Sequence, residues 1–227
     1  MSLIFLLALA LAPGMAIALY IYLKDADEPE PLRPLIMGLS FGVLAFGISI
    51  GLGLLLSGVT DIREGDFIQQ MIKAFIFVGL IEEGSKFLFL RGVMYRNPNF
   101  NEPFDGIVYA VMIGMGFATA ENILYVVNGD AGTAIIRMFT AVPAHAVFAV
   151  IMGFFVGEAK VFPTSAGLYA GIGLFLATFV HGVYDYFLFI SFVPGLWIQA
   201  IISLIIAVVL SHFAMKRHQG DSRFKSD

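Results

Sequence analysis

Seven ionisable side chains lie inside stretches that otherwise have the composition of membrane-spanning helices. A charged group near the bilayer centre costs roughly 2.5–3.5 kcal/mol on insertion scales, so such groups need a compensating role. Because they occur in four consecutive apolar segments, we expect them to meet in one polar site enclosed by helices. They are Glu82, Glu83, Lys86, Glu121, His145, His181 and Asp185.

Carboxylates and imidazoles are the groups that hydrolysis needs. A carboxylate buried beside another carboxylate takes up a proton more readily, which suits it to activate water. Histidine can orient that water, donate a proton to a leaving group or bind a metal ion. His181 and Asp185 are four residues apart, so on a helix the aspartate can accept from one ring nitrogen and fix the tautomer.

Some of these residues also have structural interpretations. Glu82 and Lys86 have the i, i+4 spacing of an intrahelical ion pair, and Lys86 could instead extend toward the membrane surface. Asp185 could serve a structural network with His181, and either histidine could make an interhelical hydrogen bond. A joint site accounts for the whole set together, so we favour it.

The elements that must hold these groups are transmembrane helices. The chain is 59% hydrophobic and 13% charged, against about 25% charged residues in ordinary soluble domains. Its apolar runs of about 20 residues are long enough to cross the roughly 30 Å hydrocarbon layer. We predict an all-α polytopic membrane bundle of about seven transmembrane helices, over residues 3–23, 35–58, 68–91, 105–127, 134–157, 166–190 and 195–215.

The sequence predicts one transmembrane domain, residues 1–215, followed by a polar cytoplasmic tail, residues 216–227. Its first apolar run is expected to be a retained helix rather than a removed signal peptide. The chain contains no cysteine, which excludes disulfides, thiolate metal ligands and a cysteine nucleophile. The expected surroundings are the lipid bilayer, and nothing indicates binding to nucleic acid.

Lysine and arginine gather in alternate linkers, which predicts that the N-terminus is outside and the C-terminus cytoplasmic. Only Arg63 and Arg137 fall on the outer side, and Arg137 stands just inside a predicted helix. The expected cytoplasmic positions are Lys24, Arg33, Arg91, Arg96, Lys160, Lys216, Arg217, Arg223 and Lys225. Pro143, two residues before His145, should kink the fifth span beside the site.

Four short motifs follow one another on consecutive predicted spans, and together they resemble the PrsW family of intramembrane proteases. The resemblance implies a bacterial plasma-membrane endopeptidase that makes the first, outer-side cut in a single-span anti-sigma factor, releasing a sigma factor for an envelope-stress response. Distantly similar CAAX prenyl endopeptidases differ at Lys86, Glu121 and Asp185, so a prenylated substrate is not favoured. The motifs are E-E-x-x-K at 82–86, F-x-x-x-E-N at 117–122, a helix led by His145, and H-x-x-x-D at 181–185.

On this hypothesis either Glu82 or Glu83 activates water, while His145 and His181 polarise the scissile carbonyl and protonate the leaving amine. Asp185 orients His181, and Glu121 completes the catalytic set. Two adjacent glutamates on an ideal helix should not both reach one spot, so one is expected to be structural or ligating. Asn122 would supply an oxyanion donor if its side chain faced inward.

The same residues also fit a zinc site. One carboxylate, from Glu83 or Glu121, would join His145 and His181 in a His₂Glu set with an open fourth position. The sequence equally allows a metal-free glutamate and histidine enzyme, which we favour.

Two other classes of protein would use the same buried groups. A proton-coupled transporter needs Glu and His near the midplane, but the sequence shows no internal repeat and no pair of broken helices in matching halves. A catalytically inactive membrane scaffold would use the polar set for assembly. A Glu82→Gln change separates these classes, because it should abolish cleavage and leave a scaffold's assembly largely intact.

Overall fold

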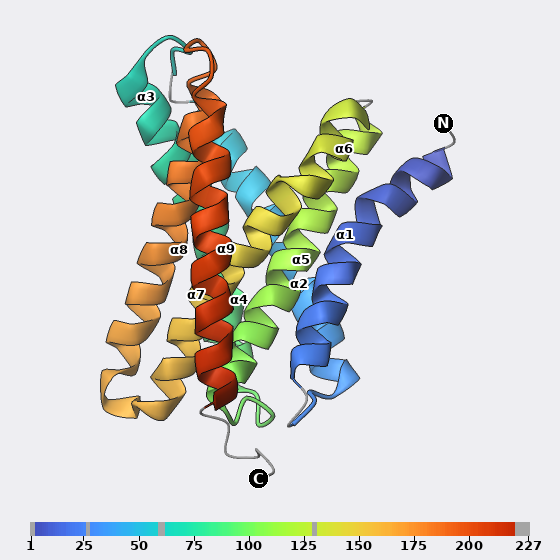
Figure 1. Cartoon of the computed structure of the whole chain (residues 1–227), viewed down its shortest axis with the longest axis vertical. Coiled ribbons are helices and arrows are strands. Elements are labelled where there is room, and N and C mark those ends of the chain that lie inside the picture. Colours follow the sequence, from blue (N-terminus) through green and yellow to red (C-terminus); the bar gives the residue numbers. More distant parts are fainter. Residues whose placement is uncertain (1–2, 26–27, 59–61, 129–130, 221–227) are drawn as a thin grey trace.

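The computed structural model describes residues 3–25, 28–58, 62–128 and 131–220, and within them every regular element is a helix. The elements form an upright bundle in which the chain runs alternately down and up (Figure 1). This confirms the predicted all-helical membrane bundle. The elements are α1 (Leu3–Lys24), α2 (Leu32–Ser57), α3 (Phe67–Ile72), the π-helix η1 (Lys73–Leu80), α4 (Ile81–Gly92), the short η2 (Met94–Arg96), α5 (Pro103–Val127), α6 (Ala131–Phe139), α7 (Ala141–Val161), the short η3 (Pro163–Ser165), α8 (Ala166–Phe189) and α9 (Trp197–Gly220).

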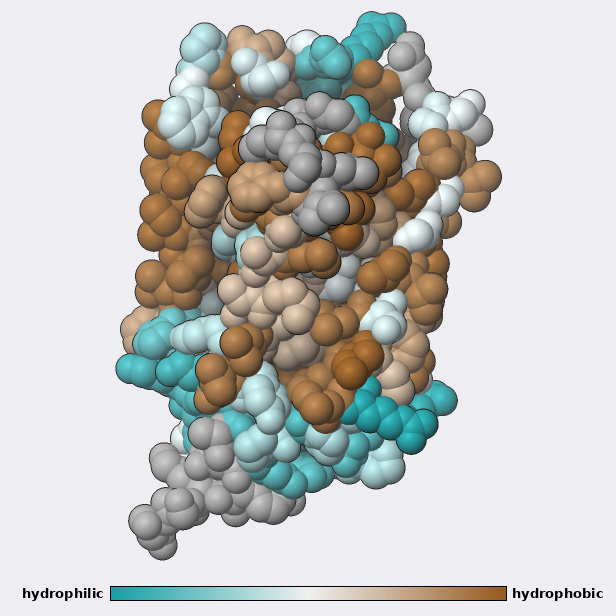
Figure 2. Space-filling model, turned by 90° about the vertical axis from the view of Figure 1, so that its right-hand side faces the viewer, coloured by the Kyte–Doolittle hydropathy of each residue, from teal (hydrophilic) through white to brown (hydrophobic). Residues whose placement is uncertain are grey.

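Six helical stretches among the described residues are long and apolar enough to cross a membrane. The middle of the molecule presents an apolar surface, with hydrophilic residues gathered toward its ends (Figure 2). The chain is therefore an integral membrane protein. The third predicted span, 68–91, is helical from Phe67 to Gly92, but it consists of α3, η1 and α4 in succession rather than one regular α-helix.

The centre of the bundle is formed by α5 and α7, which are largely buried, whereas α1, α2, α8 and α9 expose most of their surface. Glycines permit the close approach of the two central helices. A Cβ added at Gly106 would clash with the backbone of Gly153 and Gly157, and one added at Gly153 would clash with the backbone of Gly106. In a bilayer, where lipid is as apolar as the side chains, such close packing is a main source of helix association.

The fifth predicted span, 134–157, is divided at Thr140 into α6 and α7. Pro143 is the third residue of α7, in the first turn, where its missing N–H breaks no helical hydrogen bond. The predicted kink is thus present as a break three residues before the proline. It leaves α6 as a separate short helix beside α1 and α5 at the upper end of the bundle (Figure 1).

The last helix is longer than predicted. It continues to Gly220, so residues 216–220 of the expected tail are helical, and 221–227 lie outside the described residues. A buried hydrogen bond ties this end of α9 to α7. His218 Nε2 lies 3.3 Å from Glu158 Oε1 of α7, and the imidazole stacks on Phe154 at 4.2 Å between ring centroids.

Candidate active site

All seven ionisable residues selected from the sequence lie in one polar network, and an eighth, from α6, joins them. The network links α4, α5, α6, α7 and α8, and its members contact one another through hydrogen bonds and ion pairs. In order through the network they are Asp185, His181, Glu83, Lys86 with Glu82 beside it, His145, Glu121 and Arg137.

His181 lies between two carboxylates. Its Nδ1 is 2.8 Å from Glu83 Oε1, and its Nε2 is 3.3 Å from Asp185 Oδ2. The expected pairing of His181 with Asp185 is therefore present, and Glu83 is a second, closer partner. Phe148 stacks against the imidazole with 4.6 Å between ring centroids. The ring is thus fixed in orientation by both of its edges and by one face.

Lys86 is buried at the centre of the network rather than extended toward the membrane surface. Its Nζ is 2.7 Å from Glu83 Oε1 and 3.8 Å from Glu82 Oε2, so the i, i+3 pair is tighter than the i, i+4 pair considered from sequence. It also lies 3.2 Å from His145 Nδ1 and 4.1 Å from the centroid of the Phe117 ring. One ammonium therefore joins α4 to α7 and offsets the charge of the paired glutamates.

Glu82 and Glu83 both lie near Lys86 and His181, but of the two only Glu82 joins His145 and His181 in the group that could hold a metal ion, so the expectation that the two glutamates have different roles stays a prediction. Their surroundings nevertheless differ. Glu83 is fully buried and its Oε1 is bonded to Lys86 and His181, whereas the Glu82 side chain is 16% exposed and its Oε2 is 3.8 Å from the Lys86 ammonium. Glu82 is thus the less constrained of the two.

Glu121 and His145 form the other side of the site. His145 Nε2 is 3.1 Å from Glu121 Oε2, and the same oxygen forms an ion pair with Arg137. The Arg137 guanidinium also lies over the Tyr125 ring, 4.5 Å from its centroid. Since Lys86 donates to Nδ1 of His145, its Nε2 is the nitrogen that carries a proton and donates to Glu121.

Arg137 was not among the residues predicted for the site. Its sequence position near the start of a predicted span led us to count it with the outer-side basic residues. The signal that identified the other seven, a charge inside an apolar run, was present for Arg137 as well.

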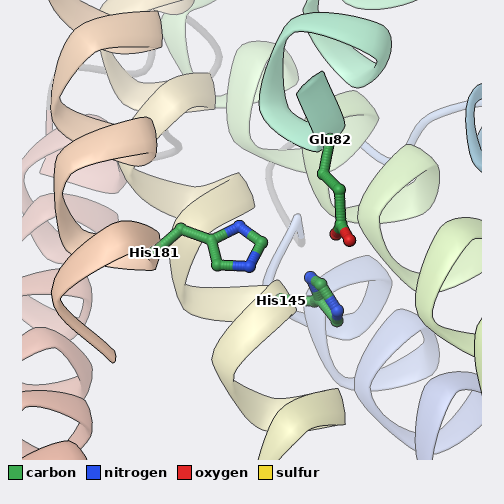
Figure 3. A group of neighbouring side chains, drawn as sticks. All are labelled: Glu82, His145 and His181. Atoms are coloured by element: carbon green, nitrogen blue, oxygen red, sulfur yellow. The ribbon is translucent and has the colours of Figure 1, made fainter. Parts of the chain in front are cut away.

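Glu82, His145 and His181 meet closely enough to hold a metal ion. One carboxylate oxygen and one nitrogen from each imidazole all lie within 4.8 Å of one another, and the three side chains point toward a common centre (Figure 3). This is a His₂Glu donor set, as zinc hydrolases use. It differs from the predicted sets in its carboxylate, because Glu83 is bonded to Lys86 and Glu121 to Arg137.

Two cavities adjoin these groups. The α2 cavity, of about 360 Å³, lies among α2, η1, α4 and α5, and the α9 cavity, of about 550 Å³, lies among α6, α7, α8 and α9. Glu82, Glu121 and Tyr125 line both cavities. Asn122, the proposed oxyanion donor, lines neither of them, since its buried amide faces an apolar crevice between α1 and α6.

An all-helical membrane bundle with buried carboxylates and imidazoles beside open cavities has the architecture of an intramembrane hydrolase. Comparison with known proteins supports this assignment to the intramembrane hydrolases. A family model described as "PrsW family intramembrane metalloprotease" matches residues 30–213. The chain belongs to this family and is an intramembrane protease.

Among its relatives is the Protease PrsW of Geobacillus kaustophilus, 38% identical over 165 residues that cover 73% of this chain and 71% of the relative. Protease PrsW of Clostridioides difficile is 33% identical over 194 residues, 82% of this chain and 78% of the relative. Protease PrsW of Bacillus subtilis is 36% identical over 116 residues, which cover 51% of this chain and 53% of the relative. No solved structure matches the chain.

Proposed function

We propose that this protein makes the first, outer-side cut in a single-span membrane protein of the anti-sigma-factor type, in the bacterial plasma membrane. The observation that carries the proposal is the contact of two lateral cavities with one carboxylate and histidine centre inside the bundle. A substrate with one transmembrane helix can present its chain to such a centre from within the bilayer. The identity of the substrate class rests on the four motifs shared with the PrsW family.

The proposed orientation places the N-terminus outside. Basic residues of the described chain gather at the end of the bundle that carries Lys24, Arg96 and Lys160, as the positive-inside rule requires of a cytoplasmic face. The site lies toward the other end. At ~1.5 Å per residue, His181 is roughly 22 Å from the start of α8 and roughly 12 Å from its end. An outer-side cut follows from this depth and orientation.

The absence of cysteine from the chain allows a direct test of orientation. A single cysteine at Gly65, in the segment between α2 and α3, should react with a membrane-impermeant maleimide added to intact spheroplasts. A single cysteine at Asn99, at the opposite end, should react only after the membrane is opened. The reverse pattern would refute the orientation.

The donor set fits the metal that the family description implies. Glu82, His145 and His181 would hold it, and a metal ion there supplies a Lewis acid for the scissile carbonyl. In that arrangement His145 would keep its Nε2 hydrogen bond to Glu121 and His181 its Nε2 contact with Asp185, the kind of carboxylate partner that orients metal-binding imidazoles. Each imidazole would then offer the metal its Nδ1, which contacts Lys86 in His145 and Glu83 in His181, so these two contacts would give way to the metal.

Glu121, which faces both cavities, takes the proton of the attacking water and returns it to the leaving amine. Arg137 and His145 hold its carboxylate in place. Glu83 and Lys86 form the buried support beneath the reacting groups.

A metal-free route is a second candidate, and the position of Lys86 favours it. The Lys86 ammonium already lies beside Glu82, Glu83 and His145, so one cation offsets the charge of this carboxylate pair. Glu82, whose side chain is partly exposed and lines both cavities, would then be the base that activates water.

The test is cleavage of a single-span anti-sigma-factor-like substrate by purified, reconstituted protein, with metal content measured on the same samples. Glu82→Gln, Glu121→Gln and His181→Ala should each abolish cleavage, and the matched surface variant Glu64→Gln should retain it. Loss of bound zinc in Glu82→Gln but not in Glu121→Gln would identify Glu82 as ligand and Glu121 as base. Full activity of wild-type protein that contains no metal would establish the metal-free route. Cleavage that survives all three site variants would refute the proposed site.

A further inference from the structure

The α2 cavity and the α9 cavity adjoin each other at two of the reacting carboxylates, which line both of them. Their shared wall consists of Glu82, Glu121 and Tyr125. Each cavity also reaches the outside of the bundle, because each has an exposed apolar residue in its lining. Ile50 of the α2 cavity is 36% exposed, and Trp197 of the α9 cavity is 59% exposed. A chain that entered one cavity and left by the other would have to pass the catalytic carboxylates.

The lining of both cavities suits unwound polypeptide. A helix hides its backbone carbonyls in internal hydrogen bonds, so a protease must bind its substrate in an extended form. Extended backbone is tolerated at membrane depth only where a cavity offers it polar partners or water. Asn128 provides an amide in the α2 cavity. The hydroxyl oxygens of Ser49 in the α2 cavity and Thr140 in the α9 cavity, which donate to carbonyls of the preceding turn, can accept from substrate N–H groups.

We propose that the substrate lies extended through both cavities, with the residues on one side of the scissile bond in the α2 cavity and those on the other side in the α9 cavity. This inference rests on the proposed function and deepens it, since it assigns the two sides of the substrate to different helices. At roughly 3.3–3.6 Å per extended residue, the chain beside the cut lies within a few residues of α2 on one side and of α9 on the other.

Site-specific photocrosslinking tests the path. The photoreactive residue p-benzoylphenylalanine is placed at Ile50, in the α2 cavity, and separately at Ile201, in the α9 cavity. Val43 and Ile205 are the matched controls, because they lie on the same two helices, are exposed and line neither cavity. The wild-type enzyme first defines the cut, and adducts with the intact substrate are then mapped by mass spectrometry.

The path predicts adducts from Ile50 and Ile201 on opposite sides of the cut and none of comparable yield from the control positions. Adducts from both probes on the same side would overturn the path while leaving the proposed function intact. An absence of substrate adducts at one probe, with lipid adducts in their place, would overturn it as well. Failure of the folded wild-type enzyme to cleave single-span substrates would overturn the proposed function and this inference with it.

A change of cavity size gives an independent test. Ser49→Trp should narrow the α2 cavity, and Gly47→Trp, where a side chain meets nothing within 4 Å, is its control. We expect kcat/KM of Ser49→Trp to fall about tenfold for substrates with a large side chain on the α2 side of the cut. The loss should disappear when that substrate residue is glycine. An equal loss for both substrates would contradict the assignment.

Discussion

Arg137 should be required for activity although it was not recognisable as part of the site from the motifs. Its guanidinium pairs with Glu121 Oε2, the oxygen that also accepts from His145 Nε2 at 3.1 Å. An Arg137→Gln change removes the positive charge and leaves Glu121 with a single strong partner. The carboxylate then becomes free to rotate away from His145, and both groups lose their fixed orientation toward the cavities.

The size of the effect follows from the burial of the pair. The side chains of Arg137 and Glu121 are 15% and 16% exposed, so this is neither a surface pair nor a fully buried one. A hydrogen bond to a charged group contributes about 1.5–3 kcal/mol. Losses of activity from removing such an outer partner are about 10–100-fold, equivalent to roughly 1.4–2.8 kcal/mol. We expect kcat to fall by this factor with a smaller change in KM.

The assay compares Arg137→Gln and Arg137→Lys with Arg63→Gln, which removes an exposed charge from the segment between α2 and α3 without touching the network. The lysine variant should recover part of the activity, and added guanidinium ion should partly rescue the glutamine variant. A purely structural role would give lower thermal stability with no rescue. Activity of Arg137→Gln equal to that of Arg63→Gln would refute the reasoning.

The remaining predictions concern stability, pH and metal. Gly106→Ala should destabilise the protein by about 1–3 kcal/mol through overpacking against α7. Gly47→Ala, where an added Cβ meets nothing within 4 Å, should stabilise the protein by about 0.5–1 kcal/mol. Thermal unfolding in detergent measures both effects. Burial raises the pKa of Asp25 to about 7 and the pKa of Glu30 to about 8. The folded state therefore holds more protons than the unfolded state between about pH 4 and pH 8. Thermal stability should accordingly fall as pH rises through this window. If Asp25→Asn left the dependence of the unfolding temperature on pH unchanged, the reasoning would be contradicted. A zinc chelator should abolish cleavage, and zinc should restore it, if the His₂Glu set holds metal; undiminished cleavage would favour the metal-free route.

The helical fold was predictable because the bilayer fixes the length and composition of each span. The clustering of the seven selected residues was predictable because buried charge is costly and therefore rare. The geometry of the site was harder to predict from the sequence. Ideal helical spacing separates Glu82 from Glu83 by about 100°, yet both side chains lie near Lys86 of the same helix and near His181 of α8. Nothing local in the sequence indicates that Arg137 meets Glu121, since their contact depends on the break at Thr140 and on how α6 packs.

The π-helix η1, immediately before the paired glutamates, makes the orientation of α4 depend on how that segment is wound. A π-helix contains more residues per turn than an α-helix, so it changes the phase between the helix before it and the helix after it. A return of η1 to α-helical winding at unchanged chain length would turn α4 relative to α3 by at least roughly the 100° that one α-helical residue spans. Glu82, Glu83 and Lys86 would then rotate together away from His145 and His181. Loss of one residue together with that return would largely cancel the turn. The winding of η1, whose eight residues carry no catalytic group, thus decides whether the glutamates of α4 face the histidines of α7 and α8.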